Sequence, residues 1–259
     1  DIVVSKFTLI GEGGATHTLG SGNVDTTNST TFTIPLNNTD KAAVNLIINK
    51  NGTSSTDGTS YNLAAAEDWA AGVNAVLNID DTTGNGINAN NIAIPAITSA
   101  AYDASTGVLA VTGTNFLSKS GAANDIVASK FTFTGEGEDS YTLTNTANVD
   151  ITSGIAFTVT LSDTDRAAVN LIINKNGTSS TNNTPYSLAA TDDWAAGADT
   201  AVNVADTAGN SINISNVAIP AITSAAYDSN TGLLTVTGTG FLKRSGSNND
   251  IDASKFTFT

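Results

Sequence analysis

Short stretches of alternating apolar and polar residues run through the whole chain. Residues 108–113 (VLAVTG) and 233–238 (LLTVTG) show this period of two, which is typical of a strand with one buried face. The same alternation predicts further strands at 130–134, 140–144, 157–161, 201–204 and 211–214. Clusters rich in Gly, Asp and other turn-forming residues separate them at 103–107, 135–139 and 206–210. The pattern indicates a mainly β protein.

Two stretches have a helical pattern instead. Asp165 is placed as an N-cap for residues 166–173 (RAAVNLII), and the pair Asn176-Gly177 supplies a stop signal. Residues 188–196 (LAATDDWAA), which Gly197 follows, predict a second short helix.

The chain also repeats itself. The sequence DIVVSKFT at residues 1–8 returns as DIVASKFT at 125–132 and as DIDASKFT at 250–257, spacings of 124 and 125 residues. Residues 39–53 (TDKAAVNLIINKNGT) return at 164–178 with one Lys-to-Arg change. A period this long predicts domain-sized units rather than the turns of a solenoid.

Proline marks the boundaries between these units. Pro95 and Pro220 occupy equivalent positions, and proline interrupts sheet hydrogen bonding and stiffens a joint. We therefore divide the chain into a first repeat that lacks its opening strands (1–95), a complete repeat (96–220) and the opening strands of a third (221–259). The fold predicted is a tandem array of Ig-like β-sandwich repeats of about 125 residues, each with a short helical insertion. Its core in the complete repeat should contain Val108, Val111, Phe116, Phe131, Phe133, Leu161, Val169, Ile172, Trp194 and Val202.

Composition narrows the possible functions. Only 13% of the residues are charged, and 24 acidic residues against 10 basic ones give a formal charge of −14. Such a surface disfavours nucleic acid and anionic membranes as partners. The chain has neither Cys nor Met, so it contains no disulfide or thiolate site. Without an initiator Met, we expect a processed product or a window on a longer array.

Several motifs resemble those of a known class of proteins. Residues 101–116 (AYDASTGVLAVTGTNF) and the turns DTTGN at 81–85 and DTAGN at 206–210 resemble parts of the tandem Ig-like repeats of giant bacterial extracellular adhesin-like and surface proteins. The segments FTGEG and NKNGTSST, the latter followed by LAA and an Asp-Trp pair, are similar to the middle of such repeats. The resemblance implies an extracellular or cell-surface location and a role as spacer, adhesin arm or surface-layer component, often stiffened by calcium.

Aspartates near the unit boundary are candidate calcium ligands. Calcium prefers several oxygen ligands, and Asp in loops supplies them. If each unit begins at one end and finishes at the other, Asp125 and Asp206 both lie near the joint at Pro95, with Asp1 and Asp81 as their equivalents. The alternative is that these aspartates only form turns and caps.

Other candidate sites have simpler interpretations. His17 is the only histidine, and Tyr141 replaces it in the next repeat, so we expect no catalytic set and no enzyme activity. The Gly-Glu-Gly segments at 11–13 and 135–137 suggest phosphate loops, but an acid opposes an anion there, and hairpin turns are favoured. Trp69 and Trp194 could stack on sugars, although a place in the core is favoured.

Two sequons, Asn51-Gly-Thr and Asn176-Gly-Thr, equally suit a helix stop and turn.

The leading hypothesis for function is an extended arm, filament or surface layer built from the repeats. The alternatives are a carbohydrate-binding array, or ancillary repeats of an extracellular enzyme whose catalytic domain lies elsewhere. Partners should be neighbouring repeats or copies of the chain itself. Residues 221–249 copy residues 96–124, so either the polypeptide continues at both ends, which we favour, or one chain's tail completes the next by strand addition.

Overall fold

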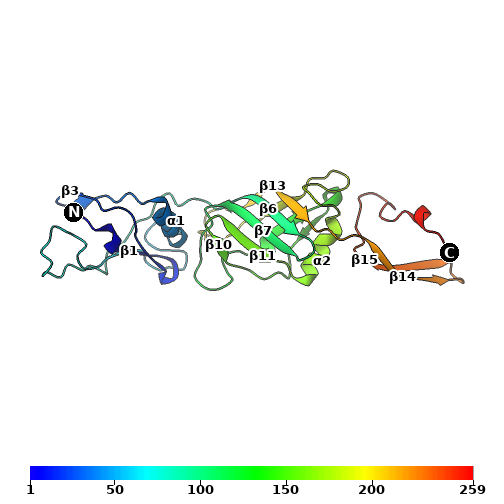
Figure 1. The fold of residues 1–259 in the computed structure, drawn as a ribbon, viewed down its shortest axis with the longest axis horizontal. Helices are drawn as coiled ribbons and strands as arrows, with labels where there is room; N and C mark the ends of the chain where they lie inside the picture. Colours follow the sequence, from blue (N-terminus) through cyan, green and yellow to red (C-terminus); the bar gives the residue numbers. More distant parts are fainter. Residues whose placement is uncertain (259) are drawn as a thin grey trace.

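The computed structural model describes residues 1–258 and shows an elongated, mainly β molecule (Figure 1). Three parts follow one another along its long axis. We call residues 1–95 the first unit, residues 96–220 the middle unit and residues 221–258 the C-terminal segment. The mainly β class predicted from the sequence is confirmed.

The middle unit contains one curled sheet of eight strands, shaped as a half-barrel. Its strand order is β10-β11-β7-β6-β13-β12-β8-β9, and all neighbours are antiparallel except β13 and β6, which are parallel. The first part of β13 pairs with β12 and its last part with β6, so this long strand connects the two halves of the sheet. The strands are β6 (Ala96–Asp103), β7 (Val108–Thr114), β8 (Phe131–Thr134), β9 (Ser140–Thr142), β10 (Ile151–Ser153), β11 (Ala156–Thr160), β12 (Ser187–Ala190) and β13 (Asp206–Ser215).

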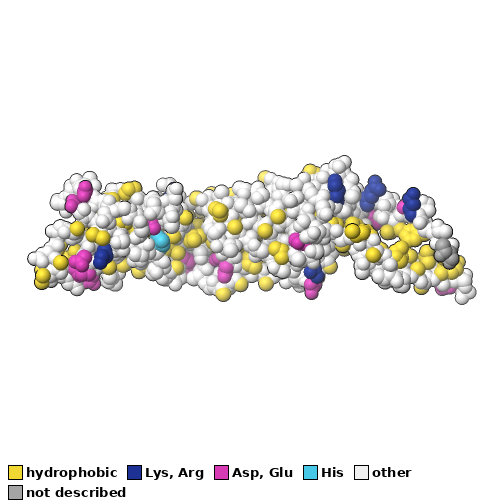
Figure 2. All heavy atoms as spheres, in the orientation of Figure 1, with side chains coloured by type: hydrophobic (Ala, Val, Ile, Leu, Met, Phe, Trp, Pro, Cys, Tyr) yellow, Lys and Arg dark blue, Asp and Glu magenta, His cyan; other side chains and the backbone are white. Residues whose placement is uncertain are grey.

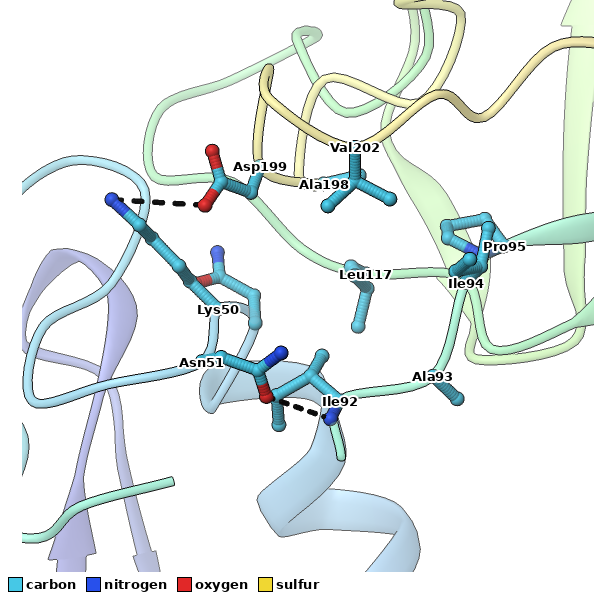
Figure 3. A pocket seen from close by; sticks show the side chains of 11 residues that line it. Lys50, Asn51, Ile92, Ala93, Ile94, Pro95, Leu117, Ala198, Asp199 and Val202 are labelled. Carbon is cyan, nitrogen blue, oxygen red and sulfur yellow. Dashed lines mark hydrogen bonds and ion pairs between the residues drawn. The ribbon is translucent and has the colours of Figure 1, made fainter. Parts of the chain in front are cut away.

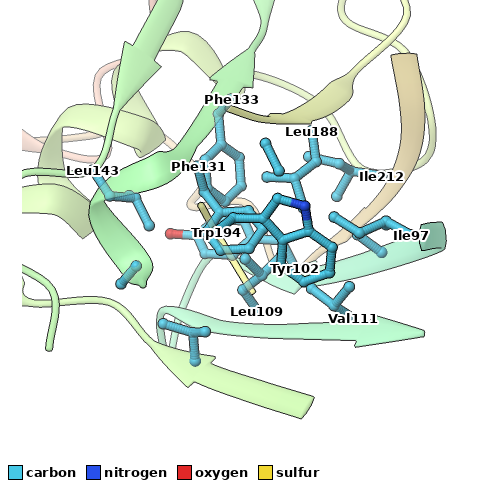
Figure 4. Packing of buried hydrophobic residues seen from close by; sticks show 14 of the residues in the cluster. Ile97, Tyr102, Leu109, Val111, Phe131, Phe133, Leu143, Leu188, Trp194 and Ile212 are labelled. Carbon is cyan, nitrogen blue, oxygen red and sulfur yellow. The ribbon is translucent and has the colours of Figure 1, made fainter. Parts of the chain in front are cut away.

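The curled sheet encloses a core centred on Trp194 (Figure 4). Trp194 is fully buried, lies edge-on to Phe116 and Phe131, and donates its indole N–H to the carbonyl of Val204 at 2.6 Å. The predicted core residues are buried, with the exceptions of Val108 and Val202, which are only partly buried. Alternation along the strands therefore identified the buried face correctly.

One helix, α2 (Asp163–Ile172), packs against β9 in this unit. It begins three residues earlier than predicted, because the hydroxyl of Ser162 accepts the Asp165 N–H at 3.1 Å and is the actual N-cap. Asp165 lies in the first turn and binds the loop after β9.

Three sequence predictions for the middle unit were wrong. Residues 206–210, predicted as a turn, form the first half of strand β13, because they pair with β12. Residues 187–190 form strand β12 rather than a helix, because Leu188 and Ala190 are buried between β8 and β13. Pairing on both sides overrides the helical propensity of the alanines. Residues 201–204 form a turn and an irregular segment rather than a strand.

The first unit has fewer and shorter strands. Its three-stranded sheet has the order β2-β1-β5, a separate two-stranded ribbon joins β3 and β4, and one helix, α1, lies beside β2. The elements are β1 (Phe7–Ile10), β2 (Thr16–Thr18), β3 (Thr26–Asn28), β4 (Thr31–Phe32), α1 (Asn38–Ile47) and β5 (Asn62–Ala65).

The C-terminal segment consists mainly of one hairpin, β14 (Ala221–Asp228) with β15 (Leu233–Thr239), which projects from the end of the molecule (Figure 1). Short 3₁₀ turns complete the fold: η1 (Val4–Lys6), η2 (Glu12–Gly14), η3 (Ala128–Lys130), η4 (Glu136–Glu138) and η5 (Ala253–Lys255). Within residues 1–258, no helix has the length and apolar character needed to cross a bilayer.

Candidate functional site: the joints between units

A Gly-Glu-Gly turn lies at the end of the first unit that faces the middle unit. Strands β1 and β2 form a hairpin around η2, which confirms the predicted turn. Gly13 has a φ of 62°, a conformation that favours glycine. A Cβ on Gly11 would lie 2.2 Å from the carbonyl oxygen of Ile47, so only glycine fits between this turn and the end of α1.

Glu12, in the middle of this turn, is buried and crosses the joint. Its Oε1 accepts the backbone N–H of Ser120, in the middle unit, at 3.0 Å. Its Oε2 accepts hydrogen bonds from the Asn49 side-chain amide (3.1 Å), the Thr56 hydroxyl (3.0 Å) and the Asp57 N–H (3.1 Å). One carboxylate thus holds a loop of its own unit and a loop of the next.

Two further side chains of the first unit reach the same loop of the middle unit. The amide of Asn49 donates to the carbonyl of Ser118 at 2.9 Å, and the hydroxyl of Ser120 donates to Asp57 at 3.0 Å. Asn49 is almost fully buried. The joint is therefore a polar contact in which the buried groups have partners from both units.

The second joint, between the middle unit and the C-terminal segment, repeats this arrangement. Glu136 accepts the backbone N–H of Ser245 at 3.1 Å, and Asn174 donates to the carbonyl of Lys243 at 2.8 Å. Asn182, at the position of Asp57, donates to the Ser245 hydroxyl at 2.8 Å. Equivalent residues therefore make equivalent contacts at both joints.

Burial and hydrogen bonding act in opposite directions on the two glutamates. Burial raises the pKa of each carboxyl, but the N–H groups and side-chain donors around it outweigh this effect. The result is a pKa of Glu12 below its usual range and a pKa of Glu136 of about 2. Both side chains are charged at neutral pH, when they are the best hydrogen-bond acceptors.

A shallow pocket at the first joint has a mixed lining (Figure 3). Apolar side chains of the middle unit, Leu117, Ala198 and Val202, face the linker residues 92–95. At its edge Lys50 lies 3.9 Å from Asp199. The linker is held because the Ile92 N–H donates to the Asn51 side chain at 3.0 Å.

The side chains of three candidate calcium ligands, Asp81, Asp125 and Asp206, accept hydrogen bonds from protein groups. Asp125 is buried, which raises its pKa, and it accepts the N–H groups of Lys119 (2.6 Å) and Ile151 (2.9 Å). Asp206 accepts the Ile97 N–H and the Asn210 amide, each at 2.9 Å.

Asp81 accepts the Asn85 amide at 2.9 Å, as Asp206 does with Asn210. Asp1 and Asp125 both accept an N–H through their main-chain carbonyls, from Ala71 and Ala196 respectively.

Asp125 and Asp206 share no hydrogen-bonding partner in the described part of the chain. Asp206 binds the backbone of Ile97 at the start of the middle unit, whereas Asp125 binds the backbone of Lys119 and Ile151, so each caps a different loop. No group of three or more His, Cys, Asp and Glu side chains suited to a metal ion occurs among residues 1–258. Calcium binding stays a prediction.

His17 has a structural position. Its Nε2 lies 2.9 Å from Asp40, which also binds the Gly20 N–H and the Ser21 hydroxyl. In the middle unit the hydroxyl of Tyr141 donates to Asp165 at 2.8 Å in the same way. His17 and Tyr141 therefore have the same structural role: each links its strand to the aspartate in the first turn of the helix.

The remaining candidates are also part of the fold. Neither indole is exposed: Trp194 is in the core and Trp69 is partly buried, with its N–H donated to the carbonyl of Ile79 at 2.7 Å. The sequon residues Asn51 and Asn176 each accept a linker N–H through their side chains.

Sequence reasoning missed the residues that form the joints: Glu12, Asn49, Ser120 and their equivalents. The available signal was the recurrence of a glutamate between two glycines in a chain that contains only four glutamates. The prediction of turns at these segments was correct for the backbone, but it assigned no function to the glutamate side chain.

Neither a protein-family model, nor a curated protein, nor a solved structure matches this chain. Its function must therefore be inferred from the joints, the fold and the sequence motifs.

Proposed function

We propose that this chain is a structural, extracellular repeat protein whose tandem Ig-like units form an extended arm, filament or surface layer. The observation that carries the proposal is the recurrence of one polar joint between successive units. Repeat arrays gain length by adding units, and a joint with fixed contacts transmits direction from one unit to the next. The elongated shape in Figure 1 agrees with such a role.

The joints supply stiffness through buried, charge-assisted hydrogen bonds. Glu12 and Glu136 accept N–H groups from the following unit, and such bonds are stronger than neutral ones. Bending the joint would take the Ser120 and Ser245 N–H donors away from one oxygen of each buried carboxylate, which is unfavourable. A flexible linker of similar length would impose no such penalty.

The test compares the full chain with the double variant Glu12→Gln/Glu136→Gln. An amide presents an N–H to the donors that the carboxylate accepts, so the joints should loosen while each unit stays folded. Small-angle X-ray scattering should show a rigid rod for the wild type and a broader distribution of shapes for the variant.

Glu138→Gln is the matched control, because Glu138 belongs to the same turn as Glu136 but is exposed. Equal scattering from the double variant and the wild type would refute the role of the joints.

The extracellular location rests on the resemblance of the repeat motifs. An acidic chain without cysteine suits such a location but does not require it. Detecting the protein on intact cells with an antibody, before and after external protease treatment, tests the location.

The carbohydrate-binding alternative needs exposed aromatic platforms. Trp194 is fully buried, and Trp69 is partly buried and packs against Phe7 and Phe32, so neither indole is an exposed platform. No observation favours this alternative over the structural role.

Calcium at the joint has its own test. An ion that binds only the folded chain at Asp125 and Asp206, or at Asp1 and Asp81, should raise the melting temperature. Identical melting curves with millimolar calcium and with chelator would exclude it.

A further inference from the structure

The first and last strands of the middle unit lie side by side and run in the same direction. Residues 100–103 of β6 pair in parallel with residues 212–215 of β13. Neither strand is at an edge of the sheet, because β7 borders β6 on its other side, and β12 and Gly177 border β13. The chain therefore enters and leaves the middle unit through two neighbouring interior strands.

Tension along the molecule acts on these two strands from opposite ends. The first unit, the middle unit and the C-terminal segment lie in line in Figure 1 and in the space-filling view of Figure 2, so a pull passes through the middle unit from one end to the other. The pull reaches β6 at its first residue, Ala96, through the linker 92–95, and it reaches β13 at its last residue, Ser215. Because the strands are parallel, the two pulls slide them past each other along their own axes.

Sliding of this kind requires many hydrogen bonds to break together. When neighbouring strands are pulled lengthwise, all the bonds between them share the force, whereas strands that are pulled apart sideways lose their bonds one at a time. Alternate residues of a strand direct their backbone groups to opposite sides, so the bonds re-form in register only after a slip of two residues, about 6.6 Å. The parallel pair of β6 and β13 is thus loaded in the direction in which it resists most.

Side chains fasten the two strands at both ends of the ladder. Near the start of β6, the Ile97 N–H donates to the Asp206 carboxylate at 2.9 Å. At the other end, the side-chain amide of Asn216 donates to the Asp103 carboxylate at 2.8 Å. The contact between the strands therefore extends beyond the paired residues in both directions.

The inner face of the strand pair is closed to water. Ala100 on β6 is 6% exposed, and Tyr102, Ile212 and Ile214 are 2% exposed or less. Tyr102 also lies edge-on to Phe133, with ring centroids 5.4 Å apart. Water, which would replace the backbone hydrogen bonds during a slip, is therefore kept from this side of the ladder, and a slip would also disrupt the core.

We propose that strands β6 and β13 form a mechanical clamp, which lets the middle unit bear tension along the array without unfolding. The clamp consists of residues 100–103 and 212–215 with the side-chain contacts at their ends. This inference rests on the proposed function, because an arm or filament that is fixed at one end and bound at the other is under tension. It adds load bearing to the structural role.

Single-molecule force spectroscopy on the full chain tests the clamp, because the direction of pulling can be chosen. The chain has no Cys, so two introduced thiols are its only attachment points. Ala93→Cys with Ala218→Cys, at exposed positions on either side of the middle unit, applies the force as the array would. Ala93→Cys with Ala205→Cys pulls the starts of the two strands apart sideways, since Ala205 is exposed and directly precedes β13.

The middle unit should unfold at higher force through positions 93 and 218 than through positions 93 and 205, at the same pulling speed. The two chains have the same fold, so only the direction of the load differs, and denaturant unfolding of both checks that their stabilities agree. Equal forces, or a higher force through positions 93 and 205, would overturn the proposal.

A pair of variants locates the resistance within the sheet. The N–H groups of Ile212 and Ile214 donate away from β6, so the N–H of Asn213 between them points toward β6. Asn213→Pro removes this N–H, and the exposed Asn213 side chain is not part of the core. Leu143→Ala is the matched control, because it leaves a cavity on the far side of the core from Ile212 (Figure 4).

Both variants are pulled through positions 93 and 218. Relative to the stability that each loses in denaturant, Asn213→Pro should lower the unfolding force more than Leu143→Ala does, because only Asn213→Pro weakens the clamp. An equal or smaller effect of Asn213→Pro would refute the assignment to this ladder. The comparison of pulling directions needs no destabilising substitution, so it decides the proposal if circular dichroism shows that Asn213→Pro fails to fold.

Failure of the clamp and failure of the proposed function give different results. A chain that is a rigid rod in scattering but unfolds at equal force in both directions would refute only the clamp. A chain that bends freely in scattering but resists more through positions 93 and 218 would refute the stiff joints and support the clamp.

Discussion

The first and middle units share most of their sequence and differ mainly in how completely their cores are closed. The packing beside the helix is the same in both units. Tyr61 and Tyr186 are both 1% exposed, and they donate their hydroxyls to Asn49 and Asn174 respectively. On the opposite side they differ, since Trp194 is fully buried and Trp69 is not. The difference coincides with the hairpin β6–β7, which only the middle unit packs against its sheet.

The half of the unit that contains the helix is therefore packed alike with or without the hairpin β6–β7. The half that contains the tryptophan is closed only where this hairpin covers it. The helix, the Gly-Glu-Gly turn and the joint residues form in both units. Residues 206–215 form a long strand between β12 and β6, but the equivalent residues 81–90 make only isolated bridges. Strand formation there follows from the available partner rather than from local preference.

The largest expected difference between the units comes from their equivalent core leucines. Leu188→Ala should lower the free energy of unfolding of the middle unit by about 3 kcal/mol, because it leaves a cavity in a closed core. Leu63→Ala should have less than half of that effect, because Leu63 is only partly buried. Denaturant unfolding of Trp69→Phe and Trp194→Phe chains lets the remaining tryptophan report on one unit at a time. Equal losses at the two positions would contradict the comparison.

The aspartates at the helix starts should show a smaller difference. Asp165 is buried and accepts hydrogen bonds from Tyr141 and from residues 144–146, so Asp165→Asn should destabilise the middle unit by about 2 kcal/mol. Asp40→Asn should weaken the first unit less, because fewer backbone N–H groups bind Asp40. The same tryptophan-reporter unfolding measures both, and the reverse order would contradict this expectation.

Acid should loosen the joints before it changes the cores. Because the pKa of Glu136 is about 2 in the folded chain and about 4.3 in an unfolded one, its contribution is fully present above about pH 4.3 and is lost as the pH falls toward 2. The pKa of Glu12 is lowered in the same direction. Scattering should therefore show increasing flexibility between pH 4 and 2, and the Glu12→Gln/Glu136→Gln chain should lack this transition. Retention of the transition in that chain would assign it to other groups.

The smallest effect is expected for the ion pair at the first joint. Lys50 and Asp199 are 3.9 Å apart and partly exposed, so Lys50→Ala should change the free energy of unfolding by less than about 1 kcal/mol. The second joint has a different pair, Lys243 with Asp139. A loss as large as that of a joint glutamate variant would show that charge, rather than the buried hydrogen bonds, holds the units together.

Much of the middle unit could be predicted because its signals are local. Alternation at 130–134 and 157–161 identified strands β8 and β11 and their buried faces, and the apolar spacing in residues 166–173 identified the helix. Prediction failed at residues 187–190, where the alanine-rich sequence favours a helix and pairing with β8 and β13 decides for a strand. Prediction also failed at the joints. Turn preference explained the two glycines of each Gly-Glu-Gly segment, but it did not predict that the glutamate between them binds the next unit.

The sequence by itself determined the repeat, the mainly β class and the turn at each Gly-Glu-Gly segment, because periodicity and steric preference act between near neighbours. Only the tertiary structure decided that Glu12 and Asn49 reach into the next unit, because hydrogen bonds to Ser120 and Ser118 depend on how separate units pack. It likewise decided that Trp69 and Trp194, in closely similar sequences, differ in burial. The burial of a side chain depends on the strands that cover it, and those strands belong to distant parts of the chain.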